Sequence, residues 1–312
     1  RQMCIRDRFY PNIYKREEIF RQEGWNYHLE QKEGPLKYNG VVYNEMKGAF
    51  SSPDEVLERE IMNHLFPDTT YGCESGGDPK NIPDLTYENF LNFHRTYYHP
   101  SNSYIYLYGN MDMEEKLAFL DEHYLSHFDY LDVDSVIQEQ KAFGACRDVT
   151  LEYPVAENEG EEDNTYLSYN MVVGNAADSQ MAMAFEVLDY ALLSAPGAPL
   201  KQALLDVKAG KDVYGSYDDG ILQPYFTVIA KGSNPDRKEE FVSVIRQVLG
   251  DIVKNGIDKK AVEAGINYFE FRYREADFSS YPKGLMYSLD ILGDWLYEKG
   301  NPFAPVSYTH LT

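Results

Sequence analysis

The chain has 312 residues, a formal net charge of -22 at pH 7 and 43% hydrophobic residues. Its length predicts about two domains, each large enough to bury a core. The negative charge argues against a nucleic-acid partner, which needs clustered lysine and arginine, although it permits attraction of basic peptides. No run approaches the roughly eighteen apolar residues of a membrane-spanning helix, so we expect no membrane partner.

The three cysteines indicate the redox environment. Cys4, Cys73 and Cys146 form no C-x-x-C pair. We therefore expect neither a disulfide framework nor a thiolate zinc site, and a reducing compartment fits. The predicted location is cytoplasmic.

The first predicted element is a strand that precedes a polar turn. Within residues 20–29, Trp25, Tyr27 and Leu29 alternate with other residues, which predicts a strand with one buried face. Residues 31–39 are polar and contain a Gly-Pro pair, which is typical of a turn.

A helix is predicted next, within residues 40–50. Glu45 lies one turn after Val41, on a face that we expect to pack against a core. A buried carboxylate costs several kcal/mol unless something positive meets it, such as an arginine, a lysine, a helix N-terminus or a metal ion. The apolar residues that share this face are Val41, Val42, Met46 and Ala49.

Further helices and one strand complete the first predicted unit. A helix starts at Pro53, and two others are capped by Thr86 and Asp112. Residues 103–109 alternate, with Ile105 on one face and tyrosines on the other, which predicts a strand. This order suits an antiparallel sheet with helices layered on one side.

The periodicity fades over residues 129–146, which are predicted to form a linker between domains. Beyond it, strands are predicted around 149–153, 167–173 and 225–231, with an acidic hairpin loop at 157–163. Apolar residues at three- and four-residue steps predict helices at 181–192, 200–205, 241–252, 258–273 and 285–296.

Several of these segments carry a resemblance to a known family. The run from Gly40 to Asp54, followed by residues 65–71 and 75–79, resembles the pitrilysin/insulinase (inverzincin) family of zinc peptidases, and most closely its presequence-protease subfamily. The resemblance continues in residues 195–206, 265–277 and 281–297. It implies an α+β fold with two partial peptidase-type domains, each an antiparallel sheet with helices layered on one face.

The resemblance also implies domain boundaries. Residues 9–128 would be the C-terminal part of a first peptidase-like domain, and 147–305 most of a second. Residues 1–8 and 306–312 resemble translated sequencing adapters and are expected to be artefactual ends.

In this family the carboxylate that corresponds to Glu45 is the third zinc ligand. The other two ligands and the general base come from an H-x-x-E-H motif on an earlier helix, and no such motif occurs in the 312 residues. The chain is therefore expected to be a fragment without catalytic residues that holds no zinc by itself, although the intact protein would. Asn44 and Lys47 are hypothesised to fix the direction of Glu45.

The implied function is metal-assisted hydrolysis of short unstructured peptides by the intact protein, with an inactive fragment. The implied partners are peptide substrates and the missing N-terminal and C-terminal halves, and we expect exposed apolar surface where the N-terminal part would pack. A non-catalytic structural or interaction subunit of the same fold is the alternative. A third possibility is an acidic binding module without a hydrolytic relative.

Two weaker site candidates remain. His123 and His127 are four residues apart, so on a continuous helix they would share a face and, with Glu122, could form a weak zinc site. Two solvated histidines near a helix end are the simpler interpretation. His94 is interpreted as a helix-face residue, and Ser75 has no base at a fixed spacing that would make it a nucleophile.

Overall fold

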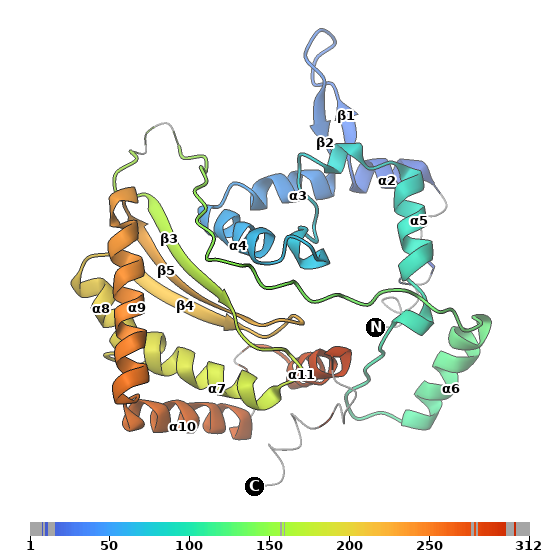
Figure 1. The fold of residues 1–312 in the computed structure, drawn as a ribbon. Coiled ribbons are helices and arrows are strands. Elements are labelled where there is room, and N and C mark those ends of the chain that lie inside the picture. Colours follow the sequence, from blue (N-terminus) through green and yellow to red (C-terminus); the bar gives the residue numbers. More distant parts are fainter. Residues whose placement is uncertain are drawn as a thin grey trace. The chain divides into compact units, whose positions relative to one another are not determined.

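The computed structural model describes residues 8, 10–11, 16–156, 158, 160–275, 278, 280–297 and 303 (Figure 1). Apart from Arg8, the expected artefactual ends lie outside these residues. The chain divides into two compact units. Unit 1 comprises Arg1–Gln138 and Phe143–Pro154, and unit 2 comprises Glu139–Ala142 and Val155–Thr312.

Unit 1 combines helices with a small hairpin. The hairpin is a two-stranded antiparallel sheet of β1 (Asn26–His28) and β2 (Lys37–Asn39). Short 3-10 turns join the other elements: η2 (Thr70–Gly72), η3 (Ile82–Asp84), η4 (Pro100–Asn102) and η5 (Leu125–His127). The helices of unit 1 are α2 (Glu17–Glu23), α3 (Val41–Ala49), α4 (Pro53–Leu65), α5 (Tyr87–Tyr97) and α6 (Met113–His123).

The helix starts of unit 1 follow from local hydrogen bonding. Before α5, the Thr86 hydroxyl oxygen accepts a hydrogen bond from the Asn89 backbone N–H at 3.1 Å, and the Asn89 side chain accepts one from the Thr86 N–H. The Asp112 carboxylate accepts from the Glu115 N–H at 3.0 Å and caps α6. Pro53 occupies the first turn of α4, where a missing N–H costs nothing.

The core of unit 1 is small. Its large buried side chains are Phe20, Ile61, Phe66, Ile82, Leu120 and Tyr124, of which only Phe66 has no exposed surface. Two of the predicted strands, 103–109 and 149–153, have no strand assigned in the structure. A strand exists only as part of a hydrogen-bonded ladder, so an alternating sequence forms one only where a neighbouring strand is supplied.

Unit 2 is a three-stranded antiparallel sheet with helices packed against it (Figure 1). The strand order is β3-β5-β4. The strands are β3 (Thr165–Val172), β4 (Asp212–Asp218) and β5 (Tyr225–Ser233). The helical segments are α7 (Ser179–Asp189), the π-helical turn η6 (Tyr190–Ser194), α8 (Pro199–Asp206), the 3-10 turn η7 (Pro235–Arg237), α9 (Lys238–Asn255), α10 (Lys259–Glu275) and α11 (Lys283–Tyr297).

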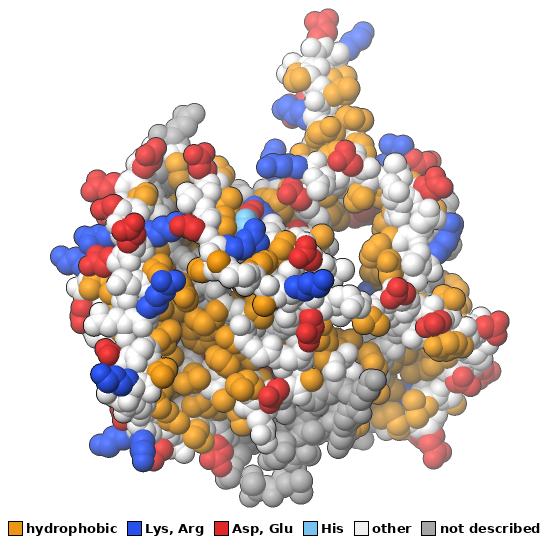
Figure 2. Space-filling model, in the orientation of Figure 1, with side chains coloured by type: hydrophobic (Ala, Val, Ile, Leu, Met, Phe, Trp, Pro, Cys, Tyr) orange, Lys and Arg blue, Asp and Glu red, His pale blue; other side chains and the backbone are white. Residues whose placement is uncertain are grey.

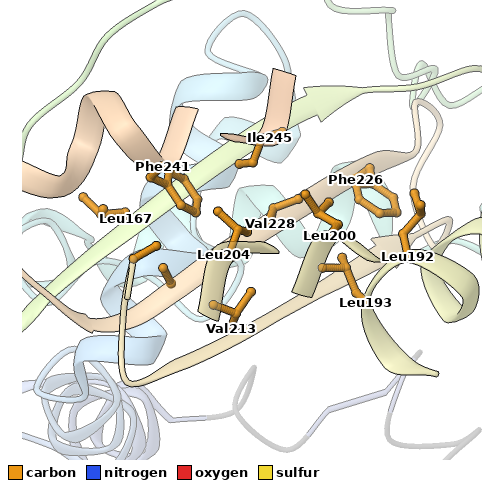
Figure 3. Close-up of a cluster of buried hydrophobic side chains, with 12 residues drawn as sticks. Leu167, Leu192, Leu193, Leu200, Leu204, Val213, Phe226, Val228, Phe241 and Ile245 are labelled. Atoms are coloured by element: carbon orange, nitrogen blue, oxygen red, sulfur yellow. The ribbon is translucent and has the colours of Figure 1, made fainter. Parts of the chain in front are cut away.

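The core of unit 2 lies between the sheet and helices α7, α8 and α9. The central strand β5 is buried at five consecutive positions from Phe226 to Ala230, as expected for a strand with a neighbour on each side. Figure 3 shows Leu200 and Leu204 of α8 pointing toward Val213 and Val228 of the sheet. The predicted α+β fold class with antiparallel sheets is confirmed.

Candidate functional site

Glycine residues fix the entry into α3, the helix that carries Glu45. Gly40 has φ of 146°, and a Cβ atom there would lie 2.2 Å from the backbone oxygen of Gly24. The Tyr43 N–H donates to that same oxygen at 3.2 Å. Only glycine fits this close approach, which ties the first turn of α3 to the end of α2.

The helix face that carries Glu45 is exposed in unit 1. Val41 and Val42 keep 52% and 38% of their surface accessible, and Glu45 is exposed as well. Instead, α3 packs through Met46, whose sulfur lies against Gly76. The prediction that Val41, Val42 and Glu45 face a core is therefore wrong for this chain. Helical periodicity identifies the residues that share a face, but it does not say which face is covered.

The residues around Glu45 do not form a zinc site on their own. Across the part of the chain that the structure describes, no cluster of three or more His, Cys, Asp or Glu side chains could hold a metal ion. Stable protein zinc sites use at least three protein ligands, so Glu45 could supply only one member of a set. The described residues therefore do not form a complete zinc site by themselves.

Asn44 and Lys47 lie beside Glu45 in sequence. The Asn44 side chain donates a hydrogen bond to the Asn39 side-chain oxygen at 2.9 Å, which links α3 to the end of β2. Lys47 is exposed on the last turn of α3. Their role in directing Glu45 stays a prediction.

An aromatic cluster lies immediately before α3. The rings of Tyr27 and Tyr38 are cross-strand partners with centroids 5.4 Å apart. Trp25 meets both rings edge-on, at 5.5 and 5.9 Å, and Tyr43 of α3 lies 5.8 Å from Tyr38. The pKa of the Tyr38 hydroxyl is raised by Tyr27, first through the charge interaction between the two hydroxyl groups and then through the hydrogen bond between them.

The burial predicted for this strand is wrong. Tyr27 and Leu29 are 59% and 43% exposed, and β1 spans only three residues. The alternation correctly indicated extended backbone, yet these side chains stay exposed among the described residues of unit 1.

The two histidines near the end of α6 are on separate elements. His123 ends α6 and His127 ends η5, because Tyr124 leaves helical geometry between them. Both line one open pocket of about 440 Å³, together with Tyr10, Phe119 and Tyr124. The shared helical face on which a two-histidine site would depend is therefore absent.

Two titratable groups outside these candidates, His94 and Asp189, have a pKa that is shifted by burial. His94 is buried, its Nε2 donates a 2.8 Å hydrogen bond to the Arg8 backbone oxygen, and its ring stacks on Tyr98. Burial lowers the pKa of His94.

In unit 2, burial raises the pKa of Asp189 to about 6, against the opposing effect of a hydrogen bond from Ser194. Sequence reasoning missed Asp189, whose only signal is an acidic residue at the end of an apolar helix.

Comparison with known proteins decides the family. The family model of the peptidase M16 inactive domain matches residues 84–269, which is more than half of the chain. The chain belongs to the peptidase M16 family. The matched segment begins after Glu45, so the family model itself says nothing about a ligand role for this residue.

Relatives match nearly the whole M16 chain. It is 51% identical to Protein HypA of Clostridium perfringens over 96% of its length and 31% of the relative. It is 37% identical to presequence protease 1, chloroplastic/mitochondrial, of Arabidopsis thaliana, over 96% of this chain and 28% of the relative. The mitochondrial presequence protease of Xenopus laevis is 32% identical over 94% of this chain and 29% of the relative.

These matches confirm the resemblance to presequence proteases, and the chain spans less than a third of the length of these curated relatives.

Solved structures agree on the fold. An M16-like peptidase from Alicyclobacillus acidocaldarius matches with a TM-score of 0.59 at 17% identity, over 87% of this chain and 63% of that one. A peptidase M16 inactive domain from Pseudomonas fluorescens matches with a TM-score of 0.57 at 17% identity, over 86% of this chain and 62% of that one.

Among the described residues, no helix is both long and apolar enough to cross a bilayer.

Proposed function

We propose that this chain is part of a larger zinc-dependent peptidase that hydrolyses short unstructured peptides, and that Glu45 supplies one metal ligand. The other ligands and the general base would lie outside these 312 residues. The observation that carries the proposal is the similarity, over nearly the whole chain, to proteins named presequence proteases. The exposed position of Glu45 on α3 leaves its carboxylate accessible to such additional ligands.

The complete protein tests this proposal. It should cleave an unstructured quenched-fluorescence peptide, lose turnover in a chelator and recover it when zinc is restored. Turnover that is insensitive to chelation would contradict a metal-dependent mechanism.

The isolated chain should be inactive. A single carboxylate cannot hold zinc against water, and the described residues contain no group of three or more side chains that could hold a metal ion. The same peptide assay, with zinc added to the 312-residue chain, should give no turnover above buffer. Measurable hydrolysis would show that this chain contains a complete site.

A non-catalytic subunit of the same fold is the second candidate. It is favoured by the family description of residues 84–269 as an inactive domain. The reading frame upstream distinguishes the two: an intact H-x-x-E-H motif supports the peptidase, and a degenerate one supports the subunit. A cytoplasmic location also stays a prediction.

A further inference from the structure

An extended segment connects the two units, and we name residues 129–154 the strap. No helix or strand is assigned in it, and Figure 1 draws it as a green trace between α6 and β3. The strap passes between the units three times, because Glu139–Ala142 belongs to unit 2 and the strap residues on both sides belong to unit 1. Its charged residues are all exposed, as part of the mixed acidic and basic surface in Figure 2. An exposed, polar segment without secondary structure would ordinarily be a flexible linker.

One residue of the strap is nevertheless buried. Of residues 129–154, only Gln140 is buried, with 6% of its surface accessible. Its backbone N–H donates to the side-chain oxygen of Gln223 at 2.5 Å, and the Gln223 side-chain nitrogen donates to the Gln140 backbone oxygen at 3.2 Å. The Gln223 amide therefore pairs with the strap backbone as a neighbouring strand would. Because an unpaired buried backbone group is costly, Gln223 favours the bound position of the strap.

The surface of unit 2 that binds Gln140 is formed by two connected loops. The Val173 N–H donates to the Pro224 backbone oxygen at 2.7 Å, which joins the end of β3 to the start of β5. Asn175, in the loop after β3, donates from its side chain to the Glu139 carboxylate at 2.6 Å. Two adjacent strap residues are therefore bound by side chains from loops that are already fixed to each other.

Unit 1 holds the strap on both sides of this contact. Before it, the Ser135 hydroxyl donates to the side-chain oxygen of Asn102, in η4, at 2.6 Å. After it, the Arg147 guanidinium donates to the His64 backbone oxygen at 3.3 Å, in the last turn of α4, where carbonyl groups lack helical partners. The attachment to unit 2 therefore lies between two attachments to unit 1.

The spacing of these attachments sets how far the chain allows the units to separate. Four residues lead from Ser135 to Glu139, and a fully extended chain of this length spans about 14 Å. A later contact within unit 2, between Asp163 and Asn234, lies sixteen residues beyond Arg147. A chain of that length can span up to about 55 Å. Release of the strap from unit 2 would therefore replace a short tether by a long one.

We propose that the strap is a conformational latch: the contact of Gln140 with Gln223 keeps the two units on the short tether, and its release lets them move apart. The attachments are separate side-chain contacts rather than a continuous ladder, so the contact on unit 2 can open while the helices and strands of both units stay formed. This inference is independent of the proposed peptidase function.

Amide hydrogen exchange tests the contact itself. In the 312-residue chain with isotope-labelled glutamine, NMR follows the Gln140 N–H directly. Gln223→Ala removes both hydrogen bonds and should accelerate its exchange at least about tenfold. Glu139→Ala removes the contact with Asn175 and should act in the same direction, whereas Gln138→Ala, at an exposed residue of the strap, should leave the rate unchanged. Equal rates in the parent and both contact variants would overturn the proposal.

The distance between the units tests the tether. Spin labels at Asp121→Cys on α6 and Asp251→Cys on α9 place one label in each unit, at exposed positions, with the three native cysteines replaced by serine. Double electron–electron resonance should give a narrow distance distribution in the parent. In Gln223→Ala the distribution should broaden and extend by at least about 10 Å, as the longer tether permits.

The two measurements together decide the proposal. Faster exchange at Gln140 with a broader distance distribution supports the latch. Faster exchange with an unchanged distribution would show that Gln223 only fixes the local backbone, and would overturn it. A distribution that is already broad in the parent would also overturn it. Circular dichroism checks folding, and if Gln223→Ala loses helix content, Glu139→Ala, which alters only the strap, takes its place in both measurements.

Discussion

Asp189 is one of three carboxyl groups in unit 2, with Asp219 and Asp290, whose pKa is raised by burial. One of its carboxylate oxygens is buried without a hydrogen-bond partner among the described residues, at the junction between α7 and the π-helical turn. Burial raises the pKa of Asp189 to about 6. Because the folded state then binds the proton more tightly than the unfolded state, ionisation opposes folding as pH rises toward 6.

This predicts a measurable pH dependence. Between pH 4 and pH 6, Asp189 should lower the free energy of unfolding by about 1–2 kcal/mol, after allowance for partial solvent screening. Asp189→Asn removes one of the titrating groups and should reduce the slope of this part of the curve in urea unfolding measurements. Asp206→Asn, an exposed control on α8, should keep it. Parallel curves for the Asp189 variant and the parent would contradict the prediction.

Gly40 is the residue on which the position of α3 depends most directly. Gly40→Ala places a Cβ atom against the Gly24 backbone oxygen at a positive φ, so it should destabilise unit 1 by about 1–3 kcal/mol. Gly48→Ala is the matched control, because it lies in α3 with no atom within 4 Å of a new Cβ. The control should be neutral or stabilising, by up to about 1 kcal/mol. Thermal unfolding followed by Trp25 emission measures the stability of both variants. Equal unfolding midpoints for Gly40→Ala and Gly48→Ala would contradict the role given to Gly40.

At the scale of elements, α9 carries a buried and an exposed face on one helix. Ile245 has no exposed surface within the core of unit 2, whereas Val253 is 88% exposed. Ile245→Ala should cost about 2–5 kcal/mol through the lost contacts and the cavity it leaves. Val253→Ala should change the free energy of unfolding by no more than about 0.5 kcal/mol. Denaturant unfolding that gives similar values for the two would contradict this account of the core.

The helices of unit 2 could be predicted because the three- and four-residue spacing of their apolar side chains is visible in the sequence of each helix alone. Residues 241–252 and 285–296, predicted from periodicity, fall within α9 and α11. Strand β4 was missed because Gly215 interrupts its pattern. A Cβ there would lie 2.3 Å from the Thr227 oxygen and 2.4 Å from a Leu193 methyl carbon, so the glycine permits close packing rather than a turn.

In unit 1, strands were predicted where the structure has none. Residues 103–109 and 149–153 have the alternation of strands but no strand is assigned there. Local sequence specifies extended backbone, whereas a ladder requires a partner whose presence no local pattern reveals. The same limit explains why the face of Val41 and Glu45 was expected to be buried and is exposed.

For the molecule as a whole, the order of the predicted elements suited an antiparallel sheet with helices, the resemblance implied the α+β class, and the candidate site came only from motif resemblance. Glu45 is one acidic residue on a short helix, and nothing in its spacing distinguishes a metal ligand from a solvated carboxylate. The family match and the similarity to presequence proteases support the peptidase proposal independently of that residue. The assignment of Glu45 therefore needs its own test.

The most direct measurement is metal content and peptide turnover of the complete protein with Glu45→Gln, a change that keeps side-chain size and removes the charge. We expect zinc affinity and turnover to fall at least about 100-fold, because even residues that only support a ligand cost 10–100-fold. Glu55→Gln, at an exposed acid in the first turn of α4, is the control and should retain both. Full zinc binding and turnover in the Glu45→Gln protein would contradict the central claim.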